Sequence, residues 1–260
     1  HSTFSGPIKY AILAQHLQKD GVLGGTGLVE AGTYIAILGG TILAGLLADS
    51  ALQAVIATVG IAVLGYFSGV QVPPAPPAAE RVKPDWHIVR ASIRLVSDTM
   101  DIPPLFLAIL AISFFWTIGA VLIIIFPPLV KNVLGADEQV ASLFIAIFSI
   151  GIAIGSIAIN RLLKSEVSAR FAPVSVLVMA LFVLLLYLVA LNWGEHGEEL
   201  TTLGNFLFHP SAGLMIIALL GVAIFGGMFV VPLYAFLTTT VDKSQTSRTV
   251  AANNLVNSGT

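Results

Sequence analysis

Long apolar stretches, separated by short polar segments, run through most of the chain. A helix rises about 1.5 Å per residue, so about 20 apolar residues cross a hydrocarbon core of roughly 30 Å. Six stretches reach that length, and we expect each to be a complete membrane span. They are residues 28–48, 51–70, 105–126, 140–159, 171–191 and 211–240.

The segments between the spans suggest where the helices begin and end. Residues 1–15 resemble the last turns of a helix, and the glycine-rich residues 16–26 are expected to form a turn. Pro127 and Pro128 are expected to close the third span. Residues 242–248 are expected to form a short charged loop, followed by the start of another helix. The chain starts at His1, so we interpret it as an internal piece of a longer protein.

Residues 71–104 interrupt the apolar pattern. The run VPPAPPAAE is too rich in proline to be helical throughout, and Asp85 is a candidate N-cap for the segment after it. One apolar face then repeats at spacings of three and four, and it consists of Trp86, Val89, Ile93, Val96 and Met100. Charged residues lie on another face, and they are Arg90, Arg94 and Asp98. We expect an interfacial helix that ends before Pro103 and serves mainly as a tether, with partner docking as the alternative.

Composition supports a membrane protein. Hydrophobic residues make up 57% of the chain and charged residues 10%, against about 25% in ordinary soluble domains. The net charge of -2 argues against nucleic-acid partners, and the absence of cysteine excludes disulfides and thiolate metal sites. No P-loop or HxxxxD motif occurs, and the histidines lack ligand spacing. We therefore expect neither an enzyme nor a bound metal or cofactor.

Basic residues fall almost entirely on one side of the predicted spans. If the linker 71–104 is cytoplasmic, eleven of the twelve Lys and Arg residues are cytoplasmic and Lys131 alone is outside. Such a bias is typical of polytopic membrane proteins. It predicts a multi-pass protein with a cytoplasmic linker.

Two groups of spans joined by a basic linker resemble the middle of a major facilitator superfamily transporter, an all-α bundle of 12 helices. On this resemblance the chain runs from the end of helix 4 to the start of helix 11. Residues 1–70 belong to the N-terminal half and 105–260 to the C-terminal half. SGPIKYAIL and GLVEAGTYIAILGGTILAG further resemble the lysophospholipid transporter family, as do FGGMFVVPLYAFL and RTVAANNLVN.

This resemblance implies that lysophosphatidylethanolamine-like lipids move from the outer to the inner leaflet of the bacterial inner membrane by alternating access. Many family members are fused to an acyltransferase and acyl-ACP synthetase, which implies such a partner. Two alternatives stay open: an exporter of drugs or other amphiphiles, and a membrane anchor for a fused enzyme. The expected spans have no ionisable residue near their centres, and their apolar lining suits an acyl chain or a hydrophobic drug.

Lys9 and Glu30 are the leading site residues. Both are expected near the same edge of the membrane, and by resemblance they take the places of gating residues. Alternatively, Lys9 extends to lipid phosphates and Glu30 stabilises the start of a helix. Further candidates for lining or interhelical contacts are Tyr34, Trp116, Asn253 and Asn254.

Small residues are expected to bring helices together. Gly151 and Gly155 form a GxxxG pair that predicts close helix packing. Gly39, Gly40 and Gly45 are expected to allow close contact near the pathway. The chain departs from the family at Ala14 and Thr26, where members often have Pro and Asn. Residues 119–126 lack the basic residue that some members carry there.

Overall fold

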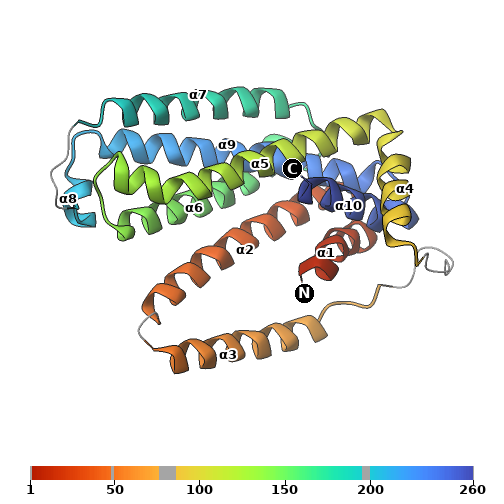
Figure 1. The fold of residues 1–260 in the computed structure, drawn as a ribbon. Helices are drawn as coiled ribbons and strands as arrows, with labels where there is room; N and C mark the ends of the chain where they lie inside the picture. Colours follow the sequence, from red (N-terminus) through yellow and green to blue (C-terminus); the bar gives the residue numbers. More distant parts are fainter. Residues whose placement is uncertain (1, 48–49, 76–85, 195–199, 260) are drawn as a thin grey trace.

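The computed structural model describes residues 2–47, 50–75, 86–194 and 200–259, and this part is almost entirely helical (Figure 1). Its ten helices confirm the expected all-α class. They are α1 Ser2–His16, α2 Lys19–Leu46, α3 Ala51–Val70, α4 Ile88–Met100, α5 Pro103–Asn132, α6 Glu138–Leu162, α7 Ala172–Leu191, α8 Leu203–Leu207, α9 Ala212–Thr239 and α10 Lys243–Ser258.

Six of these helices are long and apolar enough to cross a membrane, namely α2, α3, α5, α6, α7 and α9. This confirms the number of complete spans expected from the apolar stretches. The α3 helix occupies the predicted residues, and Ser50 caps it by accepting a hydrogen bond from the Gln53 backbone N–H. Asp49, which precedes α3, lies outside the described residues, as do Glu195, Glu198 and Glu199, which follow α7.

The start of α2 corrects the sequence prediction. Residues 19–26 are helical, and only Leu17 and Gln18 separate α1 from α2. The glycines of this segment lie within the helix instead of a turn, and a Cβ atom added at Gly24 would lie 3.3 Å from Asn160 Nδ2 of α6. A Cβ atom added at Gly27 would lie 2.6 Å from the backbone oxygen of Ser156 in α6. Glycine lowers helix propensity in water, but here it lets two helix backbones approach closely.

The end of α5 was also predicted incorrectly, whereas α9 matches its predicted residues to within one position at each end. Pro127 and Pro128 lie inside α5, which continues to Asn132. Phe126 and Val130 are fully buried on either side of them, so packing holds this turn in place despite the missing N–H donors. The chain turns instead at Gly135, where φ is 58°.

The expected charged loop after α9 is largely helical. Residues 243–248 form the first turns of α10, and Asp242 is its N-cap residue. Pro232 lies inside α9, as expected from the length of that span. The charges of this segment therefore lie on a helix, which fixes their positions against the neighbouring elements.

The core forms where α9 packs against α6 and α7. The GxxxG prediction is confirmed, because a Cβ atom at Gly155 would lie 1.9 Å from the backbone oxygen of Ile224 in α9. At Gly151 it would lie 2.5 Å from the Cβ atom of Ala223. The two glycines therefore place the α6 and α9 backbones in direct contact.

The N-terminal helices meet this core unequally. The α2 helix packs against α6 and α9, and α1 packs against α10, whereas α3 stands apart with none of its residues buried (Figure 1). A Cβ atom at Gly39 or Gly40 would meet nothing within 4 Å, so the expected close contact is missing there among the described residues. The surroundings of Gly45 lie outside the described part of the structure.

The linker contains the predicted amphipathic helix. The α4 helix covers residues 88–100 with His87 at its N-cap, whereas the candidate cap Asp85 lies outside the described residues. Pro103 and Pro104 open α5, where the missing N–H donors cost little. In Figure 1, α4 runs across the ends of the long helices.

Replacing Gly27 with alanine is expected to destabilise the protein, because the new methyl group would collide with the α6 backbone. Overpacking of this kind costs roughly 1–3 kcal/mol. The melting temperature in detergent measures the effect. Gly32→Ala is the matched control, since a Cβ atom at Gly32 meets nothing within 4 Å on the same helix. Equal melting temperatures for the two variants would contradict the close approach of α2 to α6.

Candidate functional site

Glu30 is buried in the middle of α2. It lies eleven residues after Lys19, which begins the helix, and is therefore about 16 Å along it. Its side chain is 2% exposed. The structure corrects two expectations: Glu30 does not begin a span, and one span does contain an ionisable residue near its centre. Such residues are rare inside membrane helices and mark functional sites.

Aromatic side chains surround this carboxylate. The Tyr10 hydroxyl of α1 donates a hydrogen bond to Glu30 Oε1. The Tyr10 ring stacks on Tyr234 of α9, with ring centroids 4.8 Å apart and planes 8° apart. Tyr34, one turn after Glu30, is also buried. The carboxylate is therefore held by the Tyr10 hydroxyl in a buried region that two further tyrosines share.

The chain of contacts continues into the C-terminal group of helices. Trp116 Nε1 of α5 donates a hydrogen bond to the Tyr234 hydroxyl at 2.8 Å. Tyr10, Glu30, Tyr34, Trp116 and Tyr234 are called the tyrosine cluster below. The cluster joins α1 and α2 to α5 and α9, so a movement between the two helix groups has to break or rearrange it.

Lys9 lies beside the tyrosine cluster. Its Nζ is 4.7 Å from the centroid of the Tyr10 ring, a distance at which a cation is attracted to the ring. Within the described part of the chain, no ion pair within 4.0 Å joins Lys9 to Glu30. Tyr10 contacts both groups instead, through its ring and its hydroxyl.

Asparagine side chains of α10 lie next to the tyrosine cluster. Tyr234 faces Asn253 and Asn257, and Ser113 Oγ of α5 donates to Asn257 Oδ1 at 2.6 Å. Asn253 is fully buried, and its Oδ1 has no hydrogen-bond partner among the residues that the structure describes. Asn254 is partly buried and accepts from Asn253 Nδ2 at 3.5 Å. An unpaired buried amide oxygen is a ready acceptor for a polar group that enters the cluster.

The structure thus brings five of the six candidate residues to one place and sets Asn254 at its border. Sequence reasoning gave Tyr10 no role and overlooked Asn257. The spacing of Asn253 and Asn257 at i, i+4 was an available signal. Tyr10 could not be assigned, because its partner Glu30 was placed at a helix end.

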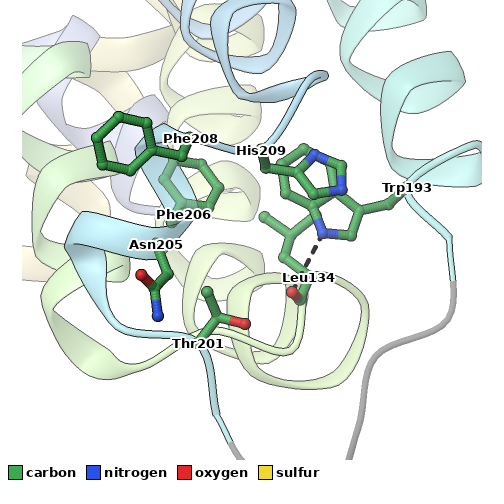
Figure 2. A pocket seen from close by; sticks show the side chains of 7 residues that line it. All are labelled: Leu134, Trp193, Thr201, Asn205, Phe206, Phe208 and His209. Carbon is green, nitrogen blue, oxygen red and sulfur yellow. Dashed lines mark hydrogen bonds between the residues drawn. The ribbon is translucent and has the colours of Figure 1, made fainter.

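Further contacts lie away from the tyrosine cluster, at the two ends of the molecule. At the end near α4, Lys243 Nζ donates to the Gln15 backbone oxygen at 3.1 Å and ties α10 to the end of α1. At the opposite end, a cavity of about 180 Å³ lies beside Trp193, whose ring stacks on His209 with centroids 4.0 Å apart (Figure 2). Trp193 Nε1 also donates to the Leu134 backbone oxygen at 3.2 Å, so this cavity is bordered by packed side chains.

The fold and the site together define a polytopic α-helical membrane protein with a polar cluster buried between two groups of helices. The chain belongs to the Major Facilitator Superfamily, because the sequence model of that family matches residues 3–259.

Several known relatives share one description. The lysophospholipid transporter LplT of Escherichia fergusonii is 28% identical over 236 residues, which cover 89% of this chain and 54% of the relative. LplT of Serratia proteamaculans is 29% identical over 243 residues, with the same two coverages. The chain therefore spans about half the length of the relatives that it matches. No solved structure matches it significantly.

Proposed function

We propose that the protein containing this chain is a transporter that moves lysophospholipid from the outer to the inner leaflet of the bacterial inner membrane. The observation that carries the proposal is the tyrosine cluster, a buried polar site between the helix groups of a protein similar to lysophospholipid transporters. In this proposal residues 1–70 belong to one half, 71–104 form a cytoplasmic linker and 105–260 belong to the other half.

The charges at the site suit a zwitterionic headgroup. A lysophosphatidylethanolamine headgroup carries an ammonium and a phosphate, and the site offers the Glu30 carboxylate beside the Lys9 ammonium. The Tyr10, Tyr34 and Tyr234 rings provide faces that attract the ammonium. Opening on one side separates Tyr10 from Tyr234, and closing restores their contact around the substrate. Lys9 and Glu30 act as the gate of this movement.

Lysolipid uptake into spheroplasts tests the proposal directly. Cells expressing the full-length protein should accumulate labelled lysophosphatidylethanolamine above an empty-vector control. Uptake equal to that control would contradict the proposal of lysolipid transport. A buried carboxylate among aromatic rings also suits a cationic amphiphile, so export of such a compound without lysolipid uptake would favour the exporter. If the protein shows neither activity and is fused to an acyltransferase, the membrane-anchor alternative is favoured.

Exchanging the two charges is expected to separate a gating role from a packing role. Lys9→Glu alone should lower uptake about tenfold, because two carboxylates would then flank Tyr10 in a poorly solvated site. Adding Glu30→Lys should restore part of the uptake by recovering opposite charges. A double variant no better than Lys9→Glu would show that the two groups do not act as a pair. Surface expression of each variant provides the control.

A further inference from the structure

The α4 helix carries a surface that the transport site does not use. It has 13 residues and rises only about 20 Å, so it is too short to cross a membrane. In Figure 1 it lies across the end of the bundle where α5 begins and α10 starts. An amphipathic helix across the end of a membrane-spanning bundle is suited to the boundary between lipid headgroups and acyl chains.

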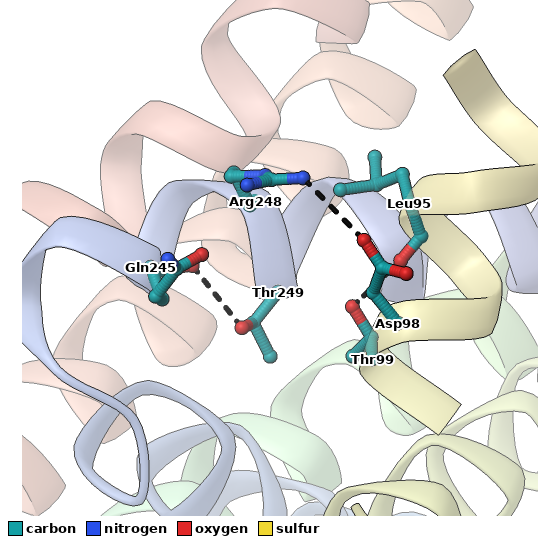
Figure 3. A network of polar contacts seen from close by, with 6 residues as sticks. All are labelled: Leu95, Asp98, Thr99, Gln245, Arg248 and Thr249. Atoms are coloured by element: carbon teal, nitrogen blue, oxygen red, sulfur yellow. Dashed lines mark hydrogen bonds and ion pairs between the residues drawn. The ribbon is translucent and has the colours of Figure 1, made fainter. Parts of the chain in front are cut away.

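One side of α4 is fixed against α10 and α5. Thr99 is buried, and Asp98 Oδ2 lies 3.9 Å from Arg248 Nη2 of α10 (Figure 3). A cavity of about 350 Å³ separates the two helices, with Leu95 and Gln245 in its lining. These contacts set the rotation of α4 and decide which residues point away from the bundle.

The side that points away is apolar. Trp86 is 84% exposed, Val89 is 73% exposed and Ile93 is 65% exposed. Val89 and Ile93 lie one turn apart on α4, and Trp86 lies two residues before the helix begins. These three exposed residues are called the α4 stripe below. An exposed tryptophan at the start of such a stripe is typical of residues placed at the membrane interface.

The charge beside the stripe is positive. Arg90 and Arg94 follow one another at i, i+4 along its border and are both exposed. Asp98, the carboxylate one turn after Arg94, already lies against Arg248. The surface around Arg94 is therefore basic, and it complements the phosphates of anionic lipids.

We propose that the α4 stripe and Arg94 bind anionic phospholipids of the leaflet that faces this end of the bundle. The stripe enters the acyl boundary while the guanidinium binds lipid phosphate. Since α4 is fixed to α10, bound lipid holds the C-terminal helix group at a set depth. The inference rests on the membrane assignment, but it does not depend on lysophospholipid being the substrate.

Tryptophan quenching in reconstituted vesicles tests this surface. The full-length protein is placed in vesicles containing a fixed fraction of brominated phosphatidylglycerol or of brominated phosphatidylethanolamine. The signal of Trp86 is the difference between the protein and its Trp86→Phe variant. We expect stronger quenching of Trp86 by the anionic lipid, and Arg94→Gln should reduce that preference about fivefold.

Arg161→Gln is the matched control, because Arg161 is an exposed arginine on a different element. It should leave the lipid preference of Trp86 unchanged. Equal quenching by the two lipids would overturn the proposal, and so would a preference that survives Arg94→Gln. Absence of quenching by either lipid would show that the stripe lies outside the membrane. Glu30→Gln should not alter this readout, so failure of lysolipid transport and failure of lipid binding are distinguishable.

Discussion

Replacing Glu30 with alanine is expected to reduce lysolipid uptake at least tenfold while leaving the protein folded. The change removes a buried carboxylate and the acceptor of the Tyr10 hydroxyl. Hydrogen bonds to charged groups contribute about 1.5–3 kcal/mol, and 1.4 kcal/mol corresponds to about tenfold. Initial uptake rates in spheroplasts, normalised to the amount of protein in the membrane, measure the effect.

Two further variants separate the charge from the hydrogen bond. Glu30→Gln keeps an acceptor for Tyr10 but removes the negative charge. Tyr10→Phe keeps the stacking on Tyr234 but removes the donor. If Glu30 binds the ammonium of the substrate, Glu30→Gln should raise the substrate concentration needed for half-maximal uptake, and Tyr10→Phe should affect it less.

Glu138→Gln is the matched control for these variants. Glu138 is an exposed carboxylate in the first turn of α6, outside the tyrosine cluster, so its loss should leave uptake unchanged. Normal uptake by Glu30→Ala would show that the buried carboxylate has no part in transport. The proposed site would then have to be abandoned.

Replacing Gly155 with alanine is expected to have the largest effect on stability. The added Cβ atom would lie 1.9 Å from the Ile224 backbone oxygen, and a backbone cannot rotate away as a side chain can. The α6 and α9 helices must separate in the middle of the core. Overpacking usually costs roughly 1–3 kcal/mol, and we expect at least the upper part of this range.

Thermal unfolding in detergent and the yield of monodisperse protein measure this loss. We expect a melting temperature lower by about 5 °C or more, with much less monodisperse protein. Gly119→Ala is the matched control, because a Cβ atom at Gly119 in α5 meets nothing within 4 Å. A Gly155→Ala protein as stable as the control would contradict the α6–α9 packing.

Several elements of this fold are predictable from the sequence because their signals are local. The residues of α3 were predicted in full, and those of α7 to within one residue, since polar or turn-forming residues border both apolar runs. The amphipathic repeat predicted α4 within the proline-rich linker. The GxxxG spacing predicted close packing of a helix on α6, and the structure shows that this helix is α9.

The same local signals failed where a residue's effect depends on its neighbours. The glycines before Glu30 indicate a turn when read alone, but α2 is continuous through them, and Gly24 and Gly27 face α6. Pro127 and Pro128 indicate a helix end, but burial of Phe126 and Val130 keeps α5 helical through them. Once α2 begins at Lys19, Glu30 moves from a helix end to its interior, and Tyr10 becomes its partner.

By itself the sequence determined that this protein is a polytopic helical membrane protein with a basic linker, because spans follow from the length of apolar runs. Only the tertiary structure decided where its buried charge lies and which side chains surround it. The physical reason is that the effects of glycine, proline and an intramembrane carboxylate depend on distant parts of the chain. Close packing of helix backbones offsets the low helix propensity of the glycines, and burial of neighbouring side chains keeps α5 helical through its prolines. The Tyr10 hydroxyl donates a hydrogen bond to the buried Glu30 carboxylate.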